Sequence, residues 1–184
     1  MKLSVRQIVI AGLMGAIAIL LGATRLGFIG PFPPLLVLPA TFMHVPVIIG
    51  GIIEGPFVGF IVGLLFGVFS WLQAPSDPSN PAFTNPLVSI LPRLFIGVTS
   101  TYAYLALRKA NEIVALAAAG IVGTLTNTIL VVGMIIVLGY VPAAVVIPLV
   151  IPNVIAEMII AVILVVVVVA TWKGIEFRRK GSSV

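Results

Sequence analysis

The chain has 184 residues, of which 61% are hydrophobic and 8% are charged, whereas a soluble domain has about 25% charged residues. This composition excludes a water-soluble globular fold, because too few polar groups remain to cover a surface, and it excludes a disordered chain. Cysteine is absent, so a disulfide framework and a cysteine metal site are also excluded. One histidine and five carboxylates offer little for catalysis, and we expect no enzyme.

Long apolar runs fill most of the chain. Backbone in lipid must satisfy its own hydrogen bonds, so such runs are expected to be helices, each using about 20 residues to cross. The sequence therefore predicts an all-α integral membrane protein, a single domain over 1–184. Its six transmembrane helices are expected at 5–24, 35–53, 56–73, 87–107, 113–139 and 149–172. Pro39 and Pro46 interrupt the second, so a full span and a part-loop, part-helix segment both stay open.

Basic residues set the expected orientation. With the N-terminus inside, eight of the ten basic residues lie on the cytoplasmic side, and six spans place both termini there. Arg25 is the only basic residue in an outer loop. The tail 178–180 is interpreted as an anchor against anionic membrane lipid, not as a nucleic-acid site. The alternative for the first segment is a signal peptide cleaved near 16–18, which would leave five spans.

Ionisable residues inside spans indicate a binding site, because a charge in lipid costs at least about 2.5–3.5 kcal/mol. Arg93 in the fourth span and Glu157 in the sixth are expected at similar depth, near the outer surface. The alternative is a structural ion pair between them with no ligand. Other polar residues are predicted to line the same outward-facing pocket: Ser89, Asn127 and Asn153 from the spans, and Trp71, Gln73 and Asn85 from the outer loop.

Small residues recur at helical spacing in two spans. Gly55, Gly59, Gly63 and Gly67 form one face of the third, for which internal packing is the favoured interpretation. Small residues of the first span, namely Ala11, Gly12, Gly15 and Ala16, form a candidate face for docking another protein, with internal packing as the alternative. The lone His44 is interpreted as a packing group, and no metal-binding triad is visible in the sequence.

These features together resemble the substrate-binding (S) component of energy-coupling factor (ECF) transporters. The resemblance covers nearly the whole chain and includes its six short spans and small-residue first helix. Its most specific part is the run from Val45-Pro46 to Gly67, which contains Gly55-Pro56-x-x-Gly59. The stretch from Asn85-Pro86 to Pro92-Arg93 also looks like the start of the fourth span in that family.

The resemblance implies a protein of the prokaryotic plasma membrane that binds one vitamin from outside. It implies docking on a shared transmembrane coupling protein that carries two ATP-binding subunits, with ATP used only by these partners and no cofactor in this chain. The absence of a Gly-x4-Gly-Lys-[Ser/Thr] motif fits this. The family docks through an Ala-x-x-x-Ala motif, whose matching positions here are Ala11 and Gly15 or Gly12 and Ala16.

The solute expected from this resemblance is a small acid. Arg93 favours a carboxylate or a phosphate, and the scarcity of aromatic residues disfavours a large flat ring. Pantothenate is the first choice, ahead of folates, flavins and corrinoids. The alternative function is a stand-alone small-solute carrier or channel, which predicts inverted repeats that we do not find. A membrane enzyme would need paired acids or a serine with a base inside the spans, and these are missing.

Overall fold

A computed structural model describes residues 3–29, 40–76 and 81–181 of the chain. Helices dominate it, and two-residue strands and 3-10 turns lie between them. The elements in chain order are α1 (Val5–Ala23), β1 (Phe28–Ile29), β2 (Ala40–Thr41), α2 (Val45–Glu54), α3 (Pro56–Gln73), η1 (Ala74–Ser76), η2 (Pro81–Thr84), α4 (Pro86–Ser89), α5 (Leu91–Leu107), α6 (Glu112–Val137) and α7 (Ala143–Gly181).

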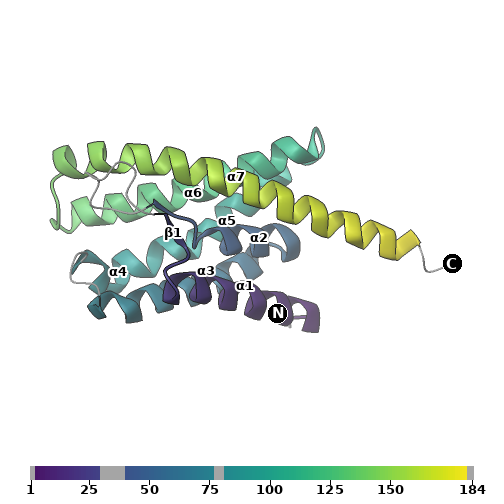
Figure 1. Cartoon of the computed structure of the whole chain (residues 1–184), viewed down its shortest axis with the longest axis horizontal. Coiled ribbons are helices and arrows are strands. Elements are labelled where there is room, and N and C mark those ends of the chain that lie inside the picture. The colour runs from purple at the N-terminus through teal and green to yellow at the C-terminus, as the bar shows by residue number, and fades with distance from the viewer. Residues whose placement is uncertain (1–2, 30–39, 77–80, 182–184) are drawn as a thin grey trace.

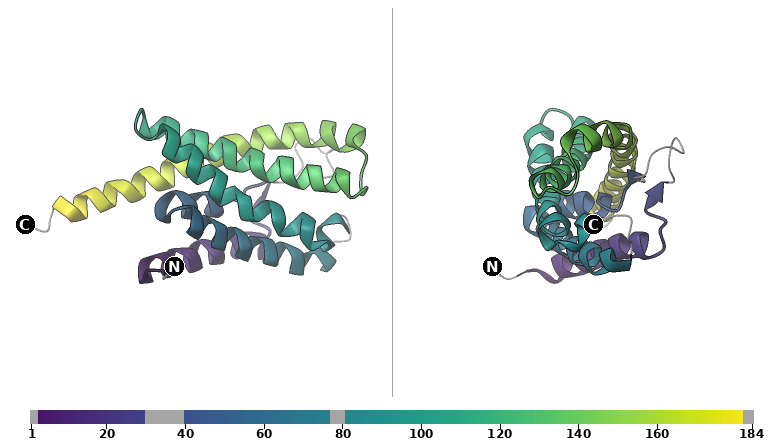
Figure 2. Two further views of the ribbon diagram at one scale, coloured as in Figure 1. Left: turned by 180° about the vertical axis from the view of Figure 1, so that it is seen from behind. Right: turned by 90° about the vertical axis from the view of Figure 1, so that its left-hand side faces the viewer.

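The long helices run roughly along one axis and form a bundle (Figures 1 and 2). Within the described residues, five stretches are long and apolar enough to cross a membrane: Val5–Ala23, Pro56–Ser76, Pro86–Leu107, Glu112–Val137 and Ala143–Gly174. This confirms the expected all-α membrane fold. The start of α1 and the end of α7 lie toward the same end of the bundle (Figure 1).

The second expected span, 35–53, is corrected by the structure. Its helix α2 begins only at Val45, and at about 1.5 Å per residue its 10 residues reach about half of a ~30 Å hydrocarbon layer. The preceding strand β2 pairs antiparallel with β1, so residues 40–41 belong to a small ribbon. Residues 35–39 of the expected span lie outside the described part of the chain. The described part therefore matches the part-loop, part-helix alternative.

Prolines set the remaining boundaries. Helix α3 matches its expected range, beginning at Pro56 after Gly55, whose φ of 97° makes the sharp turn out of α2. The fourth expected span is divided at Ile90 into α4 and α5, because Pro92 interrupts the hydrogen-bond ladder. The sixth expected start at 149 is too late: α7 begins at Ala143 and continues through Pro148 and Pro152.

Gly59 and Gly63 of the glycine face pack against α5, and Gly67 packs against the end of α4, which bears out the internal-packing interpretation for these three. Gly55 instead forms the turn before α3, where an added Cβ atom would meet nothing within 4 Å. A Cβ atom added at Gly59 would lie 2.8 Å from the Cα atom of Gly97, so the two backbones touch. Such close approach maximises van der Waals contact between helices in lipid. Because α5 carries Arg93, this contact fixes the position of the arginine relative to α3.

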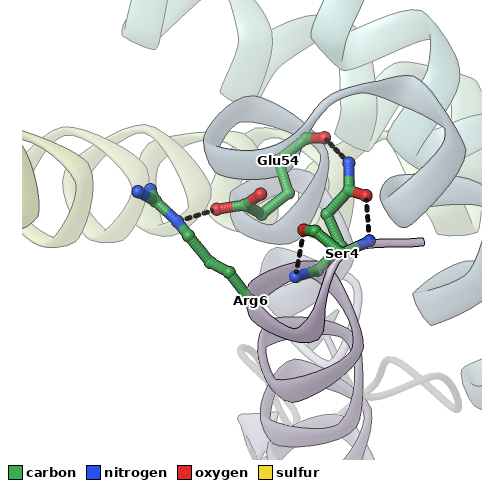
Figure 3. Close-up of polar contacts among 4 residues, drawn as sticks. Ser4, Arg6 and Glu54 are labelled. Carbon is green, nitrogen blue, oxygen red and sulfur yellow. Dashed lines mark hydrogen bonds and ion pairs between the residues drawn. The ribbon is translucent and has the colours of Figure 1, made fainter.

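The first turn of α1 is anchored to the end of α2 (Figure 3). Ser4 caps the helix by accepting a hydrogen bond from the backbone N–H of Gln7. Arg6 Nε lies 2.5 Å from Glu54 Oε1, and Gln7 Nε2 donates to the backbone oxygen of Glu54. These contacts hold α1 against the bundle at the end where α7 also ends.

Candidate functional site

A cavity of about 680 Å³ lies at the end of the bundle opposite the start of α1 and the end of α7. Its volume falls in the range of about 300–1,000 Å³ that is typical of small-molecule sites. Most of its lining is apolar, from α3, α6 and α7, and it includes Phe66, Val131, Val146 and Val150. A few polar side chains interrupt this lining, among them Gln73, Arg93, Asn127, Asn153 and Glu157.

Arg93 is held in the cavity wall by a proline break. Pro92 has no N–H, so the backbone oxygen of Val88, four residues earlier, lacks its helical donor. Arg93 Nη1 donates to that oxygen at 2.5 Å. The guanidinium carbon lies 5.6 Å from the ring centre of Phe66 and 5.1 Å from that of Phe83, so the cation makes cation–π contacts with two aromatic rings.

Arg93 keeps most of its donors available. A guanidinium has five N–H groups, and within the described residues only Nη1 has a hydrogen-bond partner. Nε is buried and unpartnered, and the side chain is 5% exposed. A buried cation with unused donors on a cavity wall is suited to bind an anion through charge-assisted hydrogen bonds.

Glu157 faces the same cavity without closing onto Arg93. The two are near enough to interact electrostatically, yet no ion pair joins them among the residues described. One carboxylate oxygen of Glu157 instead accepts a hydrogen bond of 2.6 Å from the backbone N–H of Thr41 in β2. The structural ion pair considered as an alternative is therefore contradicted, and both charges remain on the cavity wall.

Three of the predicted amide side chains also line the cavity. Asn127 projects from α6, and its Oδ1 is buried and has no hydrogen-bond donor in the described structure. Asn153 lies one turn before Glu157 on α7 and is 8% exposed. Gln73, at the end of α3, donates through Nε2 to the backbone oxygen of Gly22 at 3.4 Å. The buried acceptor of Asn127 could receive a hydrogen bond from a hydroxyl or amide N–H of a solute.

Three other predicted site residues do not line the cavity, which corrects the expectation. Trp71 donates through Nε1 to the backbone oxygen of Thr84 at 2.9 Å. Ser89 donates to the backbone oxygen of Phe83 at 2.5 Å, and Asn85 caps α4 by accepting from Leu87 N–H. The hydrogen bonds of these three side chains stabilise the segment between α3 and α5. That segment contains Phe83, whose ring contacts Arg93.

The cavity also has lining residues that were not predicted for the site. Phe66 and Thr41 carry no sequence signal for it, because an apolar side chain and a backbone N–H look like any others. Arg25 and Tyr140 lie at the same end. For Arg25 a signal exists, because it is the one basic residue expected in an outer loop.

The buried His44 lies outside the cavity lining. Its Nε2 is 2.9 Å from Thr124 Oγ1, which itself donates to the backbone oxygen of Gly120. The histidine therefore joins α2 to α6 as the packing group that the sequence indicated. No cluster able to hold a metal ion occurs among the described residues.

The small residues of α1 fall on two different faces. Ala11 is 6% exposed, and a Cβ atom at Gly15 would lie 2.6 Å from the Leu65 side chain, so this pair belongs to internal packing. Their expected docking role is corrected accordingly. Gly12 and Ala16 are exposed, and a Cβ atom at Gly12 would meet nothing within 4 Å. Of the two possible registers, only Gly12 and Ala16 leave the small face open.

Comparison with known proteins identifies a family and a curated relative. The family model described as "ECF transporter, substrate-specific component" matches residues 6–169. The pantothenic acid transporter PanT of Lactococcus lactis subsp. cremoris (strain MG1363) is 31% identical over 117 residues. That alignment covers 55% of this chain and 56% of the relative, so the chain spans about half the length of the curated relative that it matches.

Proposed function

Because this chain belongs to the substrate-specific component family of ECF transporters, we propose that it captures a small carboxylate-bearing vitamin from outside the cell and delivers it through an ATP-driven coupling module. Membership in a transporter family confirms that the chain is not an enzyme. We propose pantothenate as the solute and the plasma membrane of a prokaryote as the location.

The environment of Arg93 is the observation that carries this proposal. Its guanidinium is buried, makes cation–π contacts with Phe66 and Phe83, and has unused donors on a cavity wall. A buried charge needs a partner to offset the loss of hydration. Glu157 does not supply one at ion-pair distance, so the carboxylate of a solute is the natural counter-ion.

The remaining polar groups support pantothenate over a simple fatty acid. Pantothenate carries a carboxylate at one end, a central amide, and beyond the amide two hydroxyl groups on either side of a carbon that bears two methyl groups. Asn127 offers a buried acceptor with no donor, and Asn153 and Glu157 add polar atoms along the same wall. The apolar side chains of α6 and α7 suit the branched chain. The name of the Lactococcus relative, a pantothenic acid transporter, supports the same solute.

Partners in this proposal supply the energy. They are a transmembrane coupling protein and two ATP-binding subunits, and the chain itself needs no cofactor. The face of α1 that carries Gly12 and Ala16 is the proposed docking surface, because only these two small residues of the candidate motif are exposed. Close backbone approach at small residues is a common mode of helix association in lipid.

Calorimetry on the detergent-solubilised protein tests the solute. We expect saturable binding of pantothenate at one per chain. Pantothenol, in which an alcohol replaces the carboxylate, should bind at least about tenfold more weakly, since a charged hydrogen bond contributes about 1.5–3 kcal/mol. Equal affinity for the two compounds, or no binding of pantothenate, would contradict the proposal. Flux of pantothenate through liposomes that contain this chain alone would instead favour the stand-alone carrier.

A further inference from the structure

We propose that Arg25 is a capture residue at the mouth of the cavity, which attracts an anionic solute electrostatically before Arg93 binds it. This inference rests on the proposed function, because it assumes that the solute carries a negative charge. Among the described residues, Arg25 and Arg93 are the only basic side chains that line the cavity. Arg93 is buried, whereas Arg25 is exposed. The pair therefore places one cation at the surface of the cavity and one in its wall.

The backbone of Arg25 is unfavourable for an arginine. Its φ of 58° is in the left-handed region, and no other described residue except glycine has a positive φ. The residue follows Thr24, the C-cap of α1, and its N–H donates to the backbone oxygen of Gly22. Glycine is the usual residue where a helix ends in this conformation, because it has no Cβ atom. Folding of this turn therefore does not explain an arginine here.

The charge of Arg25 is also out of place by topology. Loops on the outer side of a membrane protein are depleted of Lys and Arg. The cavity end, where Arg25 lies, is the expected outer end, because the start of α1 and the end of α7 are at the other. No hydrogen bond or ion pair engages the Arg25 guanidinium within the described structure. Backbone conformation, topology and packing therefore do not favour an arginine at position 25. We attribute its presence to the positive charge that it places at the cavity.

An exposed cation at a cavity mouth acts mainly on the rate of association. Its field reaches about 10 Å at 0.1 M ionic strength and about 3 Å at 1 M. A solute approaching the cavity therefore feels Arg25 before it reaches the low-dielectric wall that contains Arg93. Steering of this kind raises association rates by about 10-fold or more and weakens as salt is added.

The test is Arg25→Gly, with association rates measured by surface plasmon resonance on immobilised, detergent-solubilised protein. Glycine takes the left-handed conformation without strain, so the melting temperature should equal or exceed that of the wild type. We expect the rate constant for pantothenate to fall about fivefold to tenfold at low ionic strength. The difference should shrink below about twofold at 1 M salt. Arg25→Lys should restore at least half of the lost rate.

Two controls make the result specific. Arg108→Gly removes the same side chain at the opposite end of the bundle and should leave association unchanged. Neutral pantothenol should associate at the same rate with Arg25→Gly as with the wild type. An unchanged rate for pantothenate in Arg25→Gly, or an equal slowing for pantothenol, would overturn the role of Arg25 while leaving the proposed function intact. Failure of the wild type to bind pantothenate would overturn both.

Discussion

Thr41 and Glu157 join the ribbon of β1 and β2 to α7, because the backbone N–H of Thr41 donates to Glu157 Oε1 at 2.6 Å. Thr41 lies in the short ribbon of β1 and β2, which follows α1, while Glu157 lies in α7. The contact spans 116 positions of sequence. The same carboxylate thus lines the cavity and contacts the ribbon.

This contact predicts that Glu157→Ala and Glu157→Gln differ in stability. Glutamine keeps an oxygen that can accept from Thr41, whereas alanine leaves that part-buried N–H without a partner, at about 1–3 kcal/mol. We expect the alanine variant to melt several degrees below the glutamine variant, since about 1 kcal/mol corresponds to roughly 2–4 °C for a chain of this size. Thermal unfolding in one detergent measures both. Equal melting temperatures would show that the hydrogen bond does not stabilise the fold.

For Arg93 we predict a loss of solute affinity from either of two substitutions. Arg93→Ala should weaken pantothenate binding by at least about 1.5 kcal/mol, the low end for a charged hydrogen bond. Arg93→Lys should also bind more weakly, because an ammonium lacks the planar fork of donors that can bind a carboxylate through two hydrogen bonds. Calorimetry checks both, with Arg108→Ala at the far end of α5 as the matched control. Unchanged affinity in Arg93→Ala would remove Arg93 from the site.

Substitution of Asn127 should weaken solute binding without lowering stability, whereas substitution of its neighbour Thr126 should lower stability without weakening binding. Asn127 Oδ1 has no partner, so Asn127→Leu should leave the melting temperature of the solute-free protein unchanged or higher. It should weaken pantothenate binding by about 1 kcal/mol, or roughly fivefold. Thr126 Oγ1 contacts Thr99 Oγ1 at 2.9 Å and Val122 O at 2.8 Å, so Thr126→Val should lower the melting temperature and keep the affinity. Loss of stability in Asn127→Leu with unchanged affinity would contradict its binding role.

Several of the spans and the two cavity charges could be predicted from sequence, because they follow from local rules. Apolar runs and their bounding prolines fix α3 to the residue. The rise per residue of a helix gives the depth of each residue below the membrane surface. On this basis Arg93 and Glu157 are expected at similar depth, and both line the cavity. The start of α2 could not be predicted in the same way, because it depends on the pairing of β1 with β2 across a connection that no local pattern specifies.

The composition of the cavity lining was less predictable, because it depends on competition for hydrogen bonds. Trp71 and Asn85 are polar groups expected in the pocket, yet their hydrogen bonds are made to backbone atoms of the segment that follows α3. Sequence also cannot decide which small residues of α1 face outward. The pairs Ala11 and Gly15, and Gly12 and Ala16, have the same composition and the same spacing. Packing against Leu65 decides it, by enclosing Gly15 and leaving Gly12 open.

That difference between Gly15 and Gly12 gives a paired prediction for docking. Gly12→Leu adds a side chain into open space, so solute binding and melting temperature should stay near wild type, while co-purification with the coupling protein should be lost because the helices can no longer approach closely. Gly15→Leu must displace Leu65, so it should lower the melting temperature, as overpacking costs about 1–3 kcal/mol. Co-expression with the coupling module, followed by affinity purification and a thermal melt of each variant, measures both effects. Retention of the complex by Gly12→Leu would exclude this face of α1 from docking.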